Sequence, residues 1–256
     1  YLSDASRFRF LEPIYKRISI KDAVTHLASV QIAGFSLYVW NERISLEIIR
    51  NLKKSNPSCL IICGGPQVPD RAESFLRKNP EIDITVHGEG EKVFMDLLGT
   101  FSSKDLSQVP GISWIDDSGK FCNNPKGERI KDLAVIPSPY LSGIFDKLMQ
   151  SQPDEEWLIL WETNRGCPFA CTFCDWGSAI ADRVFRFDID RINKELDWFS
   201  QNKIEFIFNC DANFGIFSRD VDIAQRAADN KKQYNYPKVL SVQNTKNTTE
   251  RAYITQ

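Results

Sequence analysis

Residues 164–177 read NRGCPFACTFCDWG, and Cys167, Cys171 and Cys174 stand in this stretch with the spacing CxxxCxxC. Three thiolates on one short loop can converge on a single soft metal centre, and a cubane iron–sulfur cluster ordinarily takes four cysteine ligands. A loop that supplies only three leaves one iron open to a substrate or cofactor. An open coordination position is typical of metal sites that carry out chemistry, as in catalytic zinc sites.

The three cysteines, with the aromatic Phe173 before the last of them, resemble the cluster motif of radical S-adenosylmethionine (SAM) enzymes. The local sequence ETNRGCP at 162–168 is similar to the branch of that family with an N-terminal cobalamin-binding domain. The resemblance implies a [4Fe-4S] cluster whose open iron binds the amino and carboxylate groups of SAM. It implies reductive cleavage of SAM to a 5′-deoxyadenosyl radical, with an external electron donor of the flavodoxin or ferredoxin type. In such enzymes the cofactor carries the hard chemistry and the protein supplies placement.

Two other interpretations of these cysteines stay open. Structural zinc requires four ligands, and Cys210 is available further along the chain as a fourth. The thiols could also be unrelated core residues, since free cysteine is often buried. The flanking sequences RGCP and CDWG favour the iron–sulfur interpretation over both.

Composition limits the classes of protein to consider. The 256 residues suggest one large or two ordinary domains, and 42% hydrophobic with 26% charged residues is typical of a globular chain. The net charge of −2 offers no general electrostatic attraction to nucleic acid, and no apolar run approaches the roughly 20 residues of a membrane span. No signal peptide is visible, although Tyr1 is not a start methionine. Seven cysteines without a disulfide layout favour a reduced, cytoplasmic setting, because the thiolates must stay free to bind iron.

Residues 1–136 alternate short apolar runs with amphipathic segments. Apolar runs at 32–39, 59–63 and 84–87 predict buried strands, and Ser19 and Asn41 are expected to cap helices. This alternation predicts an α/β, Rossmann-like, doubly wound parallel sheet, with a small hairpin at 111–122. Ligands of such sheets bind outside the carboxyl ends of the strands.

The pattern as a whole resembles the cobalamin-binding domain of the same family. The resemblance implies that loops at the strand ends contact the corrin and its nucleotide tail. The alternative is that the glycines of these loops serve only to end the strands, as glycine turns often do. The DxHxxG motif is absent, so we expect no histidine ligand to cobalt and interpret His87 as a strand-end residue. Because the family has another strand and glycine loop before Ser19, the domain is expected to be incomplete at its N-terminus. The predicted cobalamin contacts are Tyr38, Trp40, Gly64, Gly65, Pro66, Gly88, Glu89 and Gly90.

The second half of the chain predicts the beginning of a barrel. A proline-rich segment at 137–156 is expected to be a linker, like the family's Pro-Ser-Pro-Tyr linker. Strands at 157–161, 204–208 and 239–242 alternate with two helices, of which the first begins at Asp190 and the second at Asp220. The resemblance implies a (β/α)6 partial barrel at 157–256 that is incomplete at its C-terminus.

Two residues after the strand at 204–208 are candidates for SAM binding. Asp211 and Asn213 match the position that meets the SAM amino group in the family, and a carboxylate suits an ammonium group because a charge-assisted hydrogen bond is strong. The alternative is that Asp211 caps a turn. Phe173 is expected near the adenine or as a shield of the cluster. No catalytic side chain is assigned.

The resemblance implies a cobalamin-dependent radical SAM enzyme, with C-methylation of an unactivated carbon as the expected reaction. The substrate would be a small molecule or a peptide, for which a peptide natural product is one candidate. Radical cyclisation or rearrangement without methyl transfer is the first alternative. A zinc-stabilised binding module without catalysis is the second.

Overall fold

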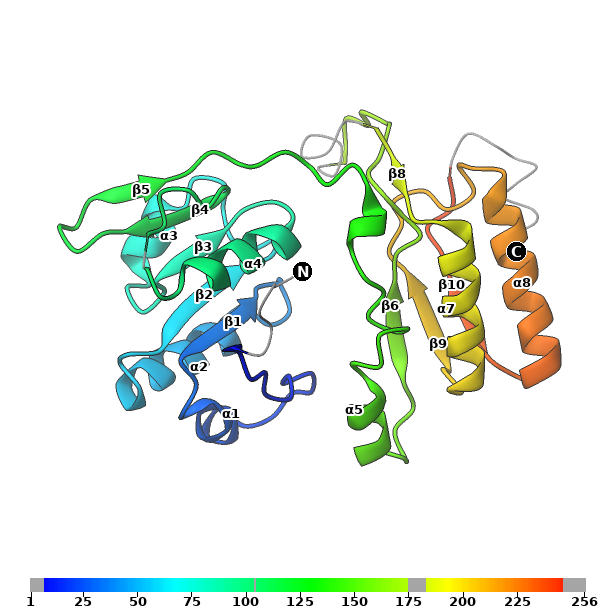
Figure 1. Cartoon of the computed structure of the whole chain (residues 1–256), viewed down its shortest axis with the longest axis horizontal. Helices are drawn as coiled ribbons and strands as arrows, with labels where there is room; N and C mark the ends of the chain where they lie inside the picture. The colour runs from blue at the N-terminus through cyan, green and yellow to red at the C-terminus, as the bar shows by residue number, and fades with distance from the viewer. Residues whose placement is uncertain (1–6, 104, 175–182, 246–256) are drawn as a thin grey trace. The chain divides into compact units, whose positions relative to one another are not determined.

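The computed structural model of the chain describes residues 7–103, 105–174 and 183–245. It divides into two compact units, residues 1–130 and 131–256 (Figure 1). Each unit has its own sheet and its own helices, and each is described separately below.

The first unit is built on a five-stranded sheet with the order β1-β2-β3-β4-β5. The first three strands are parallel, while β4 and β5 form an antiparallel hairpin whose first strand pairs with β3. The predicted hairpin is therefore confirmed, and it extends the sheet. The elements are α1 (Ile20–Leu27), β1 (Ile32–Ser36), α2 (Glu42–Ser55), β2 (Leu60–Gly64), α3 (Glu73–Lys78), β3 (Ile84–Val86), α4 (Gly90–Thr100), β4 (Ile112–Ile115) and β5 (Phe121–Asn123).

Helices cover both faces of this sheet, and β2 shows how. Successive side chains of a strand point to opposite faces. Ile61 packs in an apolar cluster with Leu52 of α2 and Leu76 of α3. Its neighbour Ile62 packs in a second cluster with Leu97 of α4. The Rossmann-like arrangement predicted for the first unit is confirmed.

The predicted helix caps had different outcomes. Ser19 caps α1 as expected, because its Oγ accepts a hydrogen bond from the backbone N–H of Asp22 at 3.1 Å. Asn41 precedes α2, but its side chain makes no capping bond. Its Oδ1 accepts from the Tyr38 N–H at 2.8 Å and its Nδ2 donates to the Ser36 carbonyl at 2.9 Å. Asn41 therefore holds the predicted N-cap position, but its amide closes the β1–α2 loop and makes no capping bond.

The second unit contains a parallel sheet with the order β10-β9-β6, and α7 and α8 lie on one side of it (Figure 1). A short antiparallel pair, β7 and β8, lies beside the start of the cysteine loop. Helix α7 begins one residue before the predicted Asp190, because the side chain of Asp188 caps it. The strand–helix alternation expected at the start of a barrel is confirmed. The elements are the 3-10 turn η2 (Leu133–Val135), α5 (Asp146–Ser151), β6 (Leu158–Trp161), β7 (Asn164–Arg165), β8 (Phe185–Arg186), α7 (Ile189–Gln201), β9 (Phe206–Asn209), α8 (Arg219–Tyr234) and β10 (Val239–Ser241).

The segment predicted as a linker, residues 137–156, lies in the second unit. Tyr140 packs edge-on against Phe199 of α7, with 4.7 Å between ring centroids, and contacts Trp198 at 5.8 Å. Its hydroxyl donates to the Leu160 carbonyl of β6. The Tyr140 side chain therefore attaches this segment to the helix through its ring and to the sheet through its hydroxyl.

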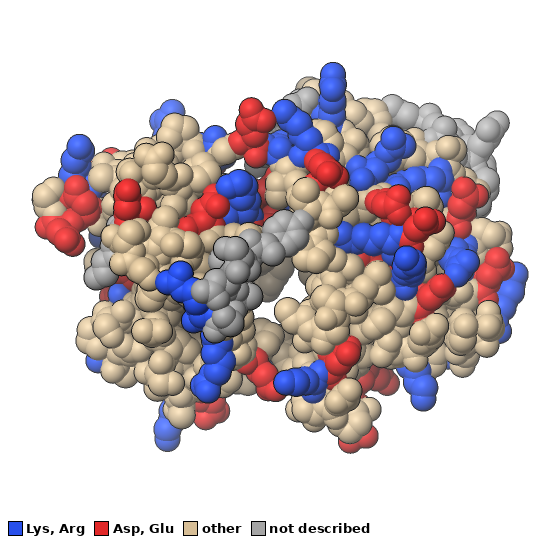
Figure 2. Space-filling view, in the orientation of Figure 1, with Lys and Arg blue, Asp and Glu red and all other residues tan. Residues whose placement is uncertain are grey.

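The surface carries charges of both signs. Lys and Arg are interspersed with Asp and Glu on the visible face (Figure 2), in keeping with the net charge of −2. Within the part of the chain that the structure describes, every helix is too short or too polar to cross a bilayer.

Candidate metal centre and ligand-binding edge

The three motif cysteines lie on the loop that follows β7. Cys167 is buried, Cys171 is half-buried and Cys174 is exposed, and all three thiols are free. Among the described residues, no three side chains of His, Cys, Asp or Glu are close enough together to hold a metal ion. The loop therefore carries the predicted donor set without holding its sulfurs in one place. The end of the motif, Asp175-Trp176-Gly177, lies outside the described residues.

The carboxylate of Asp211 is buried beneath the start of this loop. Asp211 Oδ1 accepts hydrogen bonds from the backbone N–H groups of Thr163 at 2.7 Å and Asn164 at 3.0 Å. Its Oδ2 accepts from Asn164 Nδ2 at 2.8 Å and from the Thr163 hydroxyl. All four bonds go to two adjacent residues 47 and 48 positions away. Asp211 thus clamps the segment that leads into the cysteines, and its expected contact with an ammonium group stays a prediction.

Burial and hydrogen bonding act in opposite directions on this carboxyl group. Asp211 is only 1% exposed. Burial raises its pKa from 3.8 to about 6, and the bonds from Thr163 and Asn164 lower the pKa in part. Loss of solvent disfavours a carboxylate, whereas donors aimed at its oxygens stabilise it.

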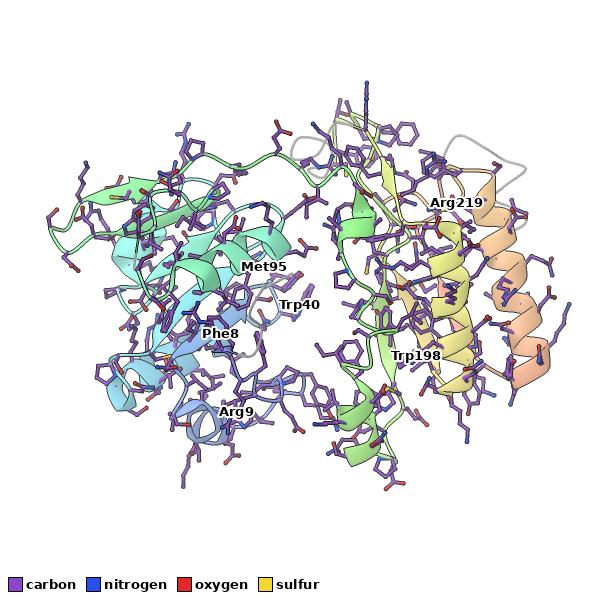
Figure 3. All side chains as sticks on the ribbon, viewed as in Figure 1. Phe8, Arg9, Trp40, Met95, Trp198 and Arg219 are labelled. Carbon is purple, nitrogen blue, oxygen red and sulfur yellow. The ribbon has the colours of Figure 1, made fainter. Side chains whose placement is uncertain are left out.

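Arg219 binds the same segment through the backbone carbonyl of Thr163. This residue begins α8 (Figure 3), and its Nη2 donates to the Thr163 carbonyl at 2.8 Å. Its Nη1 donates to the Phe187 carbonyl at 2.5 Å. Asp211 binds the N–H and the hydroxyl of Thr163, and Arg219 binds its carbonyl. Thr163 is therefore held by one residue that follows β9 and by the first residue of α8.

Asn213 contacts the first cysteine directly. Its Nδ2 lies 3.2 Å from Cys167 Sγ, and both side chains are buried. The amide N–H is the donor of this hydrogen bond and the sulfur is the acceptor. Asn213 was predicted at the site as a SAM contact, whereas its bond to a cysteine sulfur was not predicted.

The backbone at the base of the loop has a special conformation. Gly166, directly before Cys167, has a φ of 121°, which side-chain-bearing residues rarely adopt. Just before it, Arg165 forms a two-pronged ion pair with Glu162, at 3.1 and 2.8 Å to its two carboxylate oxygens. The ion pair and the glycine direct the chain into the loop.

A second buried carboxylate attaches β6 to α7, and sequence reasoning missed it. Glu195 is 1% exposed; its Oε2 accepts from Trp161 Nε1 at 2.7 Å and its Oε1 from Arg191 Nε at 2.8 Å. The only signal in the sequence is a glutamate on the apolar face of a predicted helix. Such a residue needs partners when buried.

In the first unit, the predicted cobalamin contacts lie in or directly beside three loops at one edge of the sheet. These loops follow β1, β2 and β3. Because the three strands are parallel and adjacent, the carboxyl ends of the strands lie side by side. Tyr38 and Trp40 stack with 4.6 Å between ring centroids and an angle of 12° between planes. Trp40, labelled in Figure 3 on the loop after β1, is 76% exposed. The edge therefore presents a flat aromatic surface.

The glycines of this edge have different physical roles. Gly65 has a φ of 99°, and a Cβ there would lie 2.7 Å from the Leu37 carbonyl oxygen. Gly65 is thus required by the close approach of two loop backbones. Gly88 has a φ of 81°, and a Cβ at Gly88 or Gly90 would meet no atom within 4 Å. Open space remains beside these two glycines. Gly64 is half-buried and Pro66 is exposed.

Two polar residues of this edge are bound within the unit. Glu89 Oε2 accepts from the Ile130 N–H at 2.7 Å. His87 Nε2 lies 2.9 Å from Ser113 Oγ, and burial lowers the histidine pKa. His87 is thereby joined to the hairpin strand β4.

A known protein family matches part of the first unit. Residues 18–98 match the B12 binding domain family. These residues include α1 to β3 and most of α4, and with them the three strand-end loops.

Two curated relatives align with nearly the whole chain. The 2-(S-pantetheinyl)-carbapenam-3-carboxylate methyltransferase of Streptantibioticus cattleyicolor is 37% identical over 253 residues, which cover 97% of this chain and 37% of that protein. The cobalamin-dependent radical SAM methyltransferase TokK of Streptomyces tokunonensis is 36% identical over 253 residues, with the same coverage of 97% and 37%. The chain therefore spans a little over a third of the length of these relatives.

A solved structure supports the fold. The cobalamin-dependent SAM radical enzyme OxsB, with aqua-cobalamin and SAM bound, has a TM-score of 0.63 and 23% identity, covering 84% of this chain and 30% of that chain. At this identity the similarity shows the fold alone.

Proposed function

We propose that this chain, which is homologous over nearly its whole length to cobalamin-dependent radical SAM methyltransferases, acts in the methylation of an unactivated carbon. The observation that carries the proposal is the union of two features in one chain: a B12 binding domain at residues 18–98 and the CxxxCxxC loop of the second unit. The [4Fe-4S] cluster and SAM would supply radical chemistry, and cobalamin the methyl group. The chain's own residues hold and orient these groups.

The residues of the second unit fit a cluster by their chemistry. Cys167, Cys171 and Cys174 are free thiols on one loop, and thiolates are the usual ligands of iron–sulfur clusters. A buried amide donor already faces one of the three sulfurs. The buried Nδ2 of Asn209, at the end of β9, has no hydrogen-bond partner within the described chain, so the edge retains a donor for a polar group. Loading would draw the three sulfurs together while Asp211 and Arg219 hold the base of the loop.

The first unit fits a large flat ligand. The stacked pair Tyr38 and Trp40 offers aromatic surface, and the space beside Gly88 and Gly90 lets a ligand approach the backbone. We assign the cobalamin contacts to the eight predicted residues of these loops. Because Glu89 is held by Ile130, its role there would be to shape the third loop.

The proposal extends to setting and partners. Free thiols and a cluster that must be reduced fit the cytoplasm, with a flavodoxin- or ferredoxin-type protein as electron donor. The substrate would be a small molecule; a peptide natural product remains one candidate.

The proposal is tested by metal content. The purified chain is reconstituted anaerobically with iron and sulfide, and iron, sulfide and zinc are measured for the wild type, Cys171→Ala and Cys210→Ala. We expect about four irons per chain in the wild type, as a cubane cluster requires. Cys171→Ala should lose most of this iron because only two motif thiols remain, whereas Cys210→Ala should retain it.

Zinc without iron or sulfide in the wild type would contradict the proposal. Loss of that zinc in Cys210→Ala would then identify a four-cysteine structural site. Full iron loading of Cys171→Ala would show that the ligand assignment is wrong.

A further inference from the structure

Asn213 contacts the sulfur of Cys167 at a buried position. The N···S distance is 3.2 Å, and Asn213 and Cys167 are 7% and 8% exposed. Water therefore competes little for either group. A charged acceptor makes a shorter and stronger hydrogen bond than a neutral one, so this donor becomes more effective when the sulfur is a thiolate.

The backbone on both sides of Asn213 is fixed. Two positions before it, Asp211 is bound to Thr163 and Asn164. Directly after it, the Phe214 N–H donates to the Gln243 carbonyl at 2.7 Å, and the Phe214 carbonyl accepts from Thr245 at 2.8 Å. The amide thus sits on a short segment anchored to the cysteine loop on one side and to the chain after β10 on the other. Such anchoring places the donor before any metal arrives.

We propose that Asn213 is a positioning residue for the cluster: it orients Cys167 as a ligand and raises the reduction potential of the cluster through an N–H···S hydrogen bond. The inference rests on the proposed function. Hydrogen bonds to the sulfurs are among the factors that set cluster potentials. The direction follows from charge, because the added electron increases the negative charge on the sulfurs and a donor stabilises the more negative state.

This role is compatible with the predicted contact between Asn213 and SAM. The sulfur occupies the Nδ2 side of the amide, and Oδ1 is a separate acceptor. An ammonium group could therefore bind Oδ1 while Nδ2 remains on the sulfur. One side chain would then connect a cluster ligand to the cofactor on the open iron.

The test is a redox titration of the reconstituted full chain, followed by electron paramagnetic resonance without SAM. Asn213→Leu removes the donor at similar volume, and Asn213→Gln keeps an amide on a longer arm. We expect Asn213→Leu to bind less iron, because Cys167 loses its orienting partner. The cluster that does form should have a more negative midpoint potential, so that its reduced fraction at a fixed low potential falls about three- to tenfold, as expected for the net contribution of one hydrogen bond. Asn213→Gln should recover part of this loss.

Asn213→Asp provides a second measurement if the leucine variant folds poorly. It keeps the shape of the side chain but replaces the donor with a carboxylate, so its cluster should be still harder to reduce. Midpoint potentials equal to that of the wild type in Asn213→Leu or Asn213→Asp would overturn this inference and leave the proposed function intact. A wild-type chain that assembles no cluster would instead overturn both.

Discussion

The strand-end loops of the first unit and the cysteine loop of the second are organised by opposite means. In the first unit close backbone contacts make the surface: Gly65 lets two loops touch, and the ring of Trp40 is left exposed. In the second unit buried side chains hold the backbone: Asp211 and Arg219 bind the residue that leads into the loop. Further along this loop, Cys174 and Phe173 are exposed.

The difference bears on how each region would accept its ligand. An edge formed by backbone contacts is complete before a ligand binds and suits a large, flat molecule. A loop with a clamped base and exposed side chains beyond it can rearrange around a small cluster that needs three sulfurs at one point. We therefore expect a substitution at the first edge to change either stability or cobalamin affinity. A substitution at the clamp should change both stability and iron binding.

The largest expected effect on stability is that of Gly65→Ala. A Cβ at this position would lie 2.7 Å from the Leu37 carbonyl oxygen, and the φ of 99° is strained for alanine. Strain and overpacking together should lower the free energy of unfolding by about 4 kcal/mol. Urea unfolding measures this. Gly99→Ala is the control, because it lies in α4 with no atom within 4 Å of the added Cβ and should stabilise by about 1 kcal/mol. Equal stability of Gly65→Ala and the wild type would show that the two loops do not approach as described.

Asp211→Asn is expected to disrupt the clamp. An amide in place of the carboxylate turns an N–H group towards donors of Thr163 and Asn164 and leaves at least one buried donor without an acceptor. We expect a loss of about 3 kcal/mol in unfolding free energy at neutral pH, together with lower iron content after reconstitution. The matched control is Asp197→Asn, since Asp197 pairs with Arg226 at a partly exposed site and should contribute less than about 1 kcal/mol. Normal iron content in Asp211→Asn would show that the clamp does not serve the cysteine loop.

The pH dependence of stability offers a smaller effect at the same carboxylate. Burial raises the pKa of Asp211 from 3.8 to about 6, so between these values the folded state binds more protons than the unfolded state. The stabilisation from this proton is present below about pH 4 and is lost as the pH rises through 6. The unfolding free energy of the wild type minus that of Asp211→Asn should therefore fall by about 2 kcal/mol from pH 4 to pH 7.5. A flat difference would indicate a carboxyl group with an ordinary pKa.

Trp40→Ala should affect binding but not folding. The side chain is 76% exposed, so its removal should change the unfolding free energy by less than about 0.5 kcal/mol. Loss of one aromatic contact of about 1.4 kcal/mol should weaken cobalamin binding about tenfold, as followed by absorbance titration with hydroxocobalamin. Phe10→Ala is the control, because Phe10 is 66% exposed and lies outside the strand-end loops. Unchanged affinity in Trp40→Ala would remove Trp40 from the predicted contacts.

The sequence predicted much of the fold because local patterns carry it. The apolar run at 59–63 predicted β2, observed at Leu60–Gly64, and the turn at 116–119 predicted the hairpin of β4 and β5. The pairing of β4 with β3 could not be read in this way, because Ile84 faces Trp114 from 30 positions away. Local pattern indicates that a strand forms and not which strand is its neighbour.

The candidate site shows the same limit. The cysteine spacing is local and was found at once, and Asp211 and Asn213 were singled out by their place after a strand. Their partners were not found, since Asp211 binds residues 47 and 48 positions away and Asn213 binds a sulfur 46 positions away. Asn41 shows a related limit, because the side chain at the predicted N-cap position is used here to close a loop. Side-chain partners that depend on tertiary packing are the part that the sequence alone leaves open.

The central claim is that the cysteine loop binds a cluster with one open iron. Anaerobic reconstitution followed by electron paramagnetic resonance of the reduced chain, with and without SAM, tests it most directly. The account predicts a cubane signal that changes when SAM is added, because SAM would bind the iron that has no cysteine ligand. A chain that forms no cubane cluster, or a cubane signal that SAM leaves unchanged, would contradict it.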